Sequence, residues 1–171
     1  MGKRSDFGRI PRDFYPTPES AVRPLFAHLP EGFTFSEPCA GDGRLITHLV
    51  NGGGSCVAAS DIEPRGFGIT EASYQEAPVS GDWVITNPPW DRKVLHPMIE
   101  YFSGLLPTWL LFDSDWMHTK QSIPYLPFLR KVVSVGRVKW IEDSPHTGKD
   151  NCCWYLFDKS NTERTRFYGR T

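Results

Sequence analysis

The feature that most restricts the fold is an alternation of apolar runs and turn-forming residues early in the chain. Residues 33–36, Phe-Thr-Phe-Ser, are predicted to form a short strand that leads into a glycine turn at residues 40–43. The apolar positions of residues 45–50 then recur at helical spacing, and an apolar run at residues 56–60 ends at Asp61. A strand, a glycine turn, a helix, a strand and an acid in this order predict a βαβ unit, which requires parallel strands.

Later segments continue this alternation and then change it. We expect a helix after residue 16, with Thr17 as its N-cap and Pro18 at its first position. The other expected elements are a short strand near residues 68–70, strands at 83–86, 109–112, 132–140 and 153–158, a helix at 91–104 and a helical turn at 125–129. The last two strands predict an antiparallel hairpin at the sheet edge. The fold class that follows is α/β: a three-layer α/β/α Rossmann-like fold with a mostly parallel seven-stranded sheet and a C-terminal antiparallel hairpin.

Length and composition fit one globular domain. The chain has 171 residues, and we assign residues 14–171 to a single domain and residues 1–13 to a basic, flexible N-terminus. No segment approaches the roughly 20 apolar residues of a membrane span, and the N-terminus lacks a secretory signal, so we expect a cytoplasmic protein without membrane contact. None of the four cysteines forms a Cys-x-x-Cys pair, so we expect no metal site.

Charge is distributed unevenly along the chain. The net charge of −1 neither requires nor excludes a nucleic-acid partner. Residues 1–12 and 159–171 are both basic, which leaves the middle acidic. Basic ends suit phosphate contacts, although solvated tails explain each end equally well.

The glycine turn and the acid after the second strand predict a nucleoside-binding site. Gly41 and Gly43 allow a tight turn and a close approach of the backbone to a ligand, and Asp61 lies where an acid can bind both ribose hydroxyls. A dinucleotide fingerprint would need a third glycine at the position of Ile46. Acids such as Glu37 near the turn disfavour a pyrophosphate and suit a cationic ligand, so we expect S-adenosylmethionine.

A second motif, Asn87-Pro88-Pro89-Trp90, follows the apolar strand at residues 83–86. Two consecutive prolines fix the backbone where the chain leaves the sheet. The turn presents an amide, carbonyls without local donors and an indole, a set that suits a planar group with an exocyclic amine. Alone, this sequence favours an ordinary turn. Together with the glycine turn, it favours a catalytic site.

These two motifs resemble those of class I S-adenosylmethionine-dependent methyltransferases, and more narrowly the enzymes that methylate adenine N6, in the order that places the cofactor motif first. The resemblance spans nearly the whole chain. Two departures are the tryptophan where tyrosine or phenylalanine is commoner, and the lack of a separate target-recognition domain. It implies that the cofactor is bound by Tyr15, Thr17, Pro18, Glu37, Pro38, Ala40, Gly41, Gly43, Asp61 and Asn87, and that Asn87, Pro88, Pro89 and Trp90 are catalytic.

The implied reaction is transfer of a methyl group to the N6 amine of adenine in nucleic acid, with DNA favoured over RNA. Asn87 and the Pro88 carbonyl would accept the two amine hydrogens while Trp90 stacks on the base. Trp140 is the first candidate for an aromatic on the other face of the base, and Trp116 is the second. Core packing explains each of these two tryptophans slightly better. Target recognition would come from loops, a partner protein or a dimer.

Three other functions remain open from the sequence. A methyltransferase acting on RNA adenine or on a protein glutamine amide would use a similar motif, because each acceptor is a planar amine. A cofactor-binding but inactive scaffold subunit belongs to a different class, and the intact Asn87 argues against it. A nicotinamide-dependent oxidoreductase is disfavoured by the missing glycine.

Overall fold

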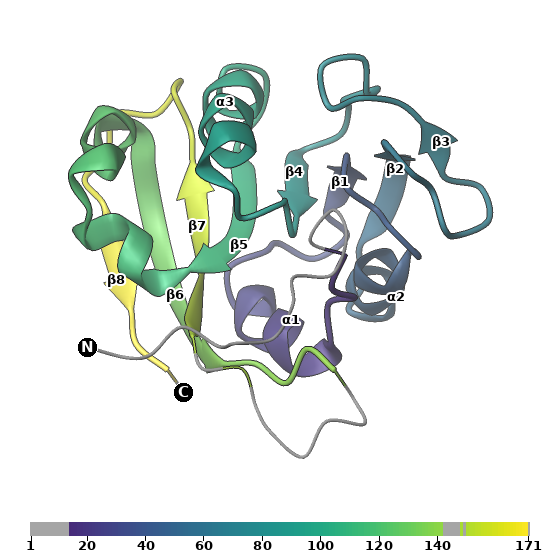
Figure 1. Cartoon of the computed structure of the whole chain (residues 1–171), viewed down its shortest axis with the longest axis horizontal. Helices are drawn as coiled ribbons and strands as arrows, with labels where there is room; N and C mark the ends of the chain where they lie inside the picture. Colours follow the sequence, from purple (N-terminus) through teal and green to yellow (C-terminus); the bar gives the residue numbers. More distant parts are fainter. Residues whose placement is uncertain (1–13, 142–147, 149, 171) are drawn as a thin grey trace.

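The structure is a computed structural model that describes residues 14–141, 148 and 150–170. These residues form one eight-stranded sheet with the strand order β3-β2-β1-β4-β5-β7-β6-β8 (Figure 1). β7 is antiparallel to both of its neighbours, β5 and β6, and the remaining pairs are parallel. The strands are β1 (Thr34–Glu37), β2 (Ser55–Asp61), β3 (Thr70–Glu71), β4 (Trp83–Thr86), β5 (Thr108–Asp113), β6 (Leu129–Arg137), β7 (Asn151–Phe157) and β8 (Arg166–Tyr168).

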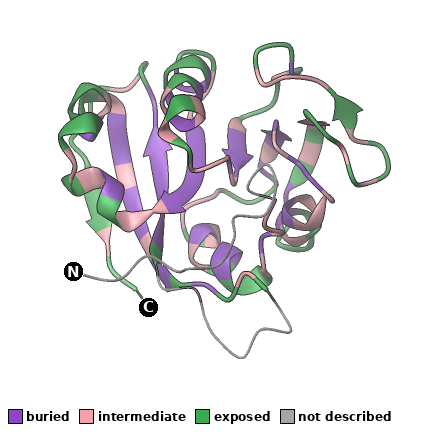
Figure 2. Cartoon of the chain, in the orientation of Figure 1, coloured by how far each residue is buried: buried purple, intermediate pink, exposed green. Residues whose placement is uncertain are grey.

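Helices cover both faces of the sheet and give three layers. α1 (Glu19–Phe26) and α2 (Arg44–Asn51) pack on one face, where their apolar residues join a core cluster with β1, β5 and β6. α3 (Arg92–Ser103) and the 3-10 segments η2 (Ser114–His118) and η3 (Lys120–Phe128) cover the other face. The central strands are buried along most of their length, whereas the helices expose their outer sides (Figure 2). Burial from both sides explains the continuous apolar runs of β5 and β7.

The predicted three-layer architecture is confirmed, and two details of the prediction are wrong. The sheet has eight strands, because Arg166–Tyr168 adds β8 in parallel to β6. The predicted hairpin of β6 and β7 therefore does not close the sheet edge. The three residues of β8 are too few to show a period in the sequence.

The chain before α1 also differs from the prediction. Pro18 is the N-cap of α1 and its first helical residue is Glu19, so Thr17 does not cap the helix. The Thr17 hydroxyl instead contacts the amide of Asn87. The predicted turn at residues 125–129 is the end of η3 followed by the start of β6. Residues 1–13 lie outside the described residues, so the predicted flexible N-terminus stays a prediction.

None of the helices in the described part of the chain combines the length and the apolar character that crossing a bilayer requires.

Candidate functional site

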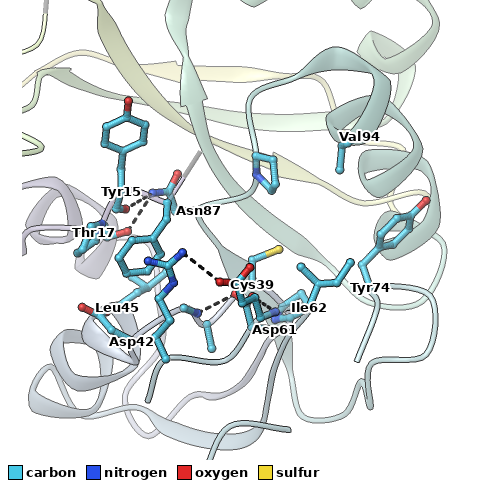
Figure 3. Close-up of a pocket in the computed structure, with 18 of the residues that line it drawn as sticks. Tyr15, Thr17, Cys39, Asp42, Leu45, Asp61, Ile62, Tyr74, Asn87 and Val94 are labelled. Atoms are coloured by element: carbon cyan, nitrogen blue, oxygen red, sulfur yellow. Dashed lines mark hydrogen bonds and ion pairs between the residues drawn. The ribbon is translucent and has the colours of Figure 1, made fainter. Parts of the chain in front are cut away.

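A cavity of about 780 Å³ opens where β1, β2 and β4 end. This is the place where open α/β sheets bind ligands, and the volume lies in the range of small-molecule sites. Figure 3 shows Tyr15, Thr17 and Asn87 grouped on one side of the cavity and Ile62 and Tyr74 on the other. The cavity is lined by Phe14, Tyr15, Pro16, Thr17, Pro38, Cys39, Ala40, Gly41, Asp42, Leu45, Asp61, Ile62, Glu63, Arg65, Ser73, Tyr74, Asn87, Pro89, Asp91, Val94 and Met98.

Two glycines shape the turn between β1 and α2. Gly41 has a φ of 53°, and a Cβ at this position would lie 2.8 Å from the ring of Phe14. Any other residue would therefore meet both backbone strain and a steric clash. Gly43 has a φ of 82° and is the N-cap of α2, where the chain turns into the helix without a side-chain cap. Gly41 lines the cavity, whereas Gly43 sets the direction of the helix behind it.

The carboxylate of Asp61 holds the glycine turn to the end of β2. Its Oδ2 accepts a hydrogen bond from the Gly41 amide at 2.8 Å, and its Oδ1 accepts one from the Glu63 amide at 2.8 Å. The Arg65 amide also donates to the Gly41 carbonyl at 2.9 Å. Each carboxylate oxygen keeps a further lone pair, so the side chain can also accept hydrogen bonds from a ligand.

Glu37 is a buried carboxylic acid beneath the same turn, with 1% of its surface exposed. Its Oε1 accepts a hydrogen bond from the Cys39 amide, whereas its Oε2 has no hydrogen-bond partner among the described residues. The Thr86 hydroxyl lies near the carboxyl and likewise has no hydrogen-bond partner within the described residues. Burial raises the pKa of Glu37 to about 8, the Thr86 and Cys39 groups oppose the shift, and the charge of Asp61 adds to it. The site therefore contains a buried acid that a cation could ionise.

The amide of Asn87 is fixed in one orientation by three neighbouring groups. Its Nδ2 donates to Thr17 Oγ1 at 3.1 Å and to the Tyr15 carbonyl at 3.4 Å. Its Oδ1 accepts a hydrogen bond from Trp90 Nε1 at 3.3 Å. A carbonyl can only accept and an indole can only donate, so these partners exclude the flipped amide. The amide oxygen keeps a second lone pair for a ligand.

The Trp90 indole is anchored to the sheet. Its Nε1 also donates to the Leu111 carbonyl of β5 at 3.1 Å, and the ring packs against both large core clusters. Trp90 is not among the residues that line the cavity. The indole N–H therefore supports the Asn87 amide, and the ring does not line the cavity.

The two other candidate tryptophans have different environments. Trp140 is half-buried, and its ring centroid lies 5.8 Å from that of Trp90 and 6.4 Å from that of Tyr15, both with edge-to-face geometry. The two indoles touch, so no base fits between them in this arrangement. Trp116 has 1% of its surface exposed and donates to His96 Nε2 at 2.9 Å. The prediction that Trp116 contacts substrate is therefore wrong, because the ring belongs to the core between η2, β5 and β7.

The structure brings most of the predicted residues into one site. The predicted residues that line the cavity are Tyr15, Thr17, Pro38, Ala40, Gly41, Asp61, Asn87 and Pro89. The predicted residues that lie next to it without lining it are Pro18, Glu37, Gly43, Pro88, Trp90 and Trp140.

Sequence reasoning missed several lining residues, of which Phe14, Arg65 and Tyr74 are the largest. The Arg65 guanidinium lies 4.0 Å from the centroid of the Phe14 ring, and together these side chains cover the glycine turn. Tyr74 lies in a segment without apolar periodicity and packs against Tyr101 and Phe102 of α3. No sequence pattern connects these residues, because each reaches the cavity through a loop.

Within the described residues, no group of three or more histidine, cysteine, aspartate or glutamate side chains is placed to hold a metal ion. All four cysteines are free thiols, and burial raises the pKa of Cys39 above its usual range.

Neither a protein-family model nor a curated protein matches the sequence. Solved structures do share its architecture. A protein provisionally named an RNA methyltransferase, from Pyrococcus horikoshii, superposes with a TM-score of 0.61 and 16% identity over 92% of this chain and 93% of its own. The 23S rRNA methyltransferase ErmE superposes with a TM-score of 0.55 and 12% identity over 87% of this chain and 71% of its own.

A modification subunit of a type I restriction enzyme from Vibrio vulnificus superposes with a TM-score of 0.57 and 14% identity. The match covers 92% of this chain and 47% of that subunit, so this chain spans about half of its length. At these identities the likeness concerns the fold. The chain has the Rossmann-like fold of these methyltransferases, as the sequence predicted.

Proposed function

We propose that the protein is an S-adenosylmethionine-dependent methyltransferase that methylates the exocyclic N6 amine of adenine in nucleic acid. The observation that carries this proposal is the fixed amide of Asn87, whose oxygen lies beside a nucleoside-sized cavity and whose nitrogen is committed to Thr17 and Tyr15. An amide held in this way acts as a hydrogen-bond acceptor, and an amine is the donor that complements it.

The residues of the cavity suit S-adenosylmethionine. Asp61 offers lone pairs to ribose hydroxyls, and the exposed Ile62 beside it offers an apolar surface to a purine. The unpartnered Oε2 of Glu37 lies beneath the turn and would be ionised by a nearby cationic group of the cofactor. Bound there, the cofactor would supply an electrophilic methyl group, and the nitrogen–carbon bond would form as the sulfur–carbon bond breaks.

The contribution of the chain is to position the amine and to increase its electron density. Asn87 Oδ1 would accept one amine hydrogen, and the Pro88 carbonyl would accept the other. The residue after Pro88 is also a proline, so no adjacent backbone N–H competes for this carbonyl. Two acceptors on one amine localise the nitrogen lone pair, which is otherwise delocalised into the ring. The proton released after transfer passes to water. The acceleration would come from orientation and from preorganised acceptors, with no covalent intermediate on the protein.

The role proposed for Trp90 changes with the geometry. Its N–H reaches both Asn87 Oδ1 and the Leu111 carbonyl, and a phenylalanine ring has no donor for these contacts. We assign Trp90 to positioning the amide. The exposed part of Trp140 next to it is then the aromatic surface available for stacking on a base, which contributes about 1–3 kcal/mol. A base in a duplex would first have to leave the stack.

The proposal is tested by incubating the protein with S-adenosylmethionine carrying a tritiated methyl group and DNA, RNA or a glutamine-containing peptide. Digestion to nucleosides would then show N6-methyladenine for DNA or RNA, and we expect DNA to be the better substrate. Label in the peptide alone would favour the glutamine-amide alternative. Cofactor binding without transfer to any of the three, unchanged by Asn87→Ala, would favour the inactive scaffold.

A further inference from the structure

The sheet edge formed by β6 and β8 carries cationic side chains that lack the partners found on other cations. Arg23, Arg44 and Arg65 each have a carboxylate within ion-pair distance. Among the described residues, no carboxylate lies within that distance of the cations on and around β6 and β8. These residues, which we call the β6–β8 cations, are Lys131, Arg137, Lys139, Arg166 and Arg170.

Two of these cations occupy opposite positions on neighbouring strands. Lys131 of β6 is in register with Arg166 of β8, and register partners in neighbouring strands point to the same side of the sheet. Like charges in this position destabilise a sheet. The positive field also reaches His28, whose pKa is lowered first by burial and then by the charge of Lys131. An anion bound across the pair would remove this repulsion.

A third cation continues the row. The side chain of Arg170 lies across Gly136, and a Cβ at this glycine would come within 3.1 Å of the guanidinium. Gly136 has a φ of 84° and lies where the register of β6 shifts against β7. Because Gly136 has no side chain, the Arg170 side chain has space to pack against the backbone near the end of β6.

The row leads toward the candidate active site. β6 is antiparallel to β7, and β7 is antiparallel to β5, so β6 ends at the same edge of the sheet as β4 and β5. Lys131 and Arg137 are six residues apart on β6, a span of about 20 Å. Arg137 and Lys139 then precede Trp140, whose ring contacts Trp90 beside Asn87. The cations thus extend from the outer sheet edge to the residues next to Trp140, whose ring contacts Tyr15 at the cavity.

We infer that the β6–β8 cations bind the phosphate backbone of the nucleic acid whose base is methylated. This inference rests on the proposed function and names the surface that would hold the polymer. Unpaired cations in a row, kept at a cost in stability, suit a chain of regularly spaced phosphates better than a single small anion. Two or more contacts along about 20 Å would also orient the strand toward Asn87.

The test compares two double variants with the same change in charge. Lys131→Gln/Arg166→Gln removes the facing pair, and the control Lys120→Gln/Lys159→Gln removes two cations from the η3 side, where Lys159 already contacts Glu100 and Phe128. Binding of fluorescein-labelled 20-nucleotide DNA and RNA single strands is measured from 50 to 300 mM salt. S-adenosylmethionine binding is measured by calorimetry in parallel.

We expect Lys131→Gln/Arg166→Gln to weaken oligonucleotide binding by about tenfold at low salt and to lower the slope of log affinity against log salt by about 1.4, since each lost single-strand contact removes about 0.7. The control should match the wild type. Cofactor binding should not change, and the melting temperature should equal or exceed that of the wild type because the repulsion is relieved.

Equal losses in the two double variants, or no loss in either, would overturn the inference and leave the proposed function standing. A wild type that binds the cofactor but no oligonucleotide would overturn both the inference and the nucleic-acid substrate. Binding to vesicles of anionic lipid in place of oligonucleotides would also overturn it.

Discussion

Polar side chains are held differently in two regions of the molecule. One region is the cavity at the ends of β1, β2 and β4, and the other is the sheet edge formed by β6 and β8. In the cavity, Asp61 and Asn87 are each fixed by hydrogen bonds to backbone or side-chain groups from other segments. At the edge, Lys131 is in register with Arg166, and neither has a carboxylate within ion-pair distance in the part of the chain that the structure describes. The comparison shows that one region supplies fixed geometry while the other supplies charge. Substitutions in the cavity should act on the rate of a reaction, and those at the edge on salt-dependent binding.

The largest effect is expected for Asn87→Ala. If the amide positions an amine, its loss should lower the rate of methyl transfer on the order of 10²–10³-fold, as the loss of one preorganised polar contact does in other enzymes. Binding of S-adenosylmethionine by calorimetry and the melting temperature serve as controls and should stay close to the wild type. A variant that keeps its rate within a factor of about three would contradict the role of the cavity.

The next largest effect concerns Glu37 and pH. Its folded-state pKa of about 8 lies above the ordinary value of 4.5, so the folded chain keeps a proton that the unfolded chain loses between these values. The contribution of this group to the free energy of unfolding therefore falls as pH rises from about 4.5 to about 8. Glu37→Gln should remove that dependence and stabilise the protein at pH 9 by on the order of 3 kcal/mol, measured by urea unfolding. The exposed Glu31→Gln is the matched control, and identical pH profiles for the two variants would refute the argument.

Substitutions of Thr17 test the hydrogen bond that holds the Asn87 amide, because Thr17 contacts this amide from a distant part of the sequence. Thr17→Val keeps the shape but removes the acceptor for Asn87 Nδ2, whereas Thr17→Ser keeps the acceptor. A hydrogen bond of this kind contributes about 1 kcal/mol, so we expect the valine variant to lose roughly fivefold to tenfold in kcat with KM for nucleic acid little changed. The serine variant should retain the rate. Equal losses in both would show that Thr17 acts through packing alone.

The smallest expected effect is that of Trp90→Phe. An aromatic ring is kept, but the donor to the Leu111 carbonyl and to Asn87 Oδ1 is lost, so the free energy of unfolding should fall by about 1 kcal/mol in a denaturant titration. Affinity for oligonucleotides should stay within a factor of two, because the Trp90 ring does not line the cavity. A large loss of oligonucleotide binding in this variant, compared with Trp140→Phe, would return Trp90 to the base-stacking role predicted from sequence.

Local sequence predicted much of the site because local chemistry forms it. The turn from Ala40 to Gly43 and the exit from β4 at Asn87 are each set by residues that are adjacent in the chain, through positive φ at Gly41 and fixed φ at the prolines. Their meeting at one edge follows from parallel strands. The position of Asp61 follows from the same rule.

The tryptophans show where this reasoning fails. Trp90, Trp116 and Trp140 are equally conspicuous in the sequence, yet one is anchored to Leu111, one is buried against His96 and one remains half-exposed. Aromatic residues serve the core and binding sites alike, and only the position of neighbouring strands distinguishes the two uses. For the same reason, no periodic pattern in the sequence predicted that the cavity would be lined by Phe14, Arg65 and Tyr74.

The layered α/β architecture and the two motifs that meet at one sheet edge follow from local residue patterns, because turn chemistry and the period of apolar residues are properties of adjacent residues. Three further features depend on the folded chain: Thr17 holds the Asn87 amide, β8 joins the sheet, and Lys131 is in register with Arg166. Each of these contacts joins residues more than thirty positions apart, and their pairing depends on the register and packing of complete strands, which no local pattern records.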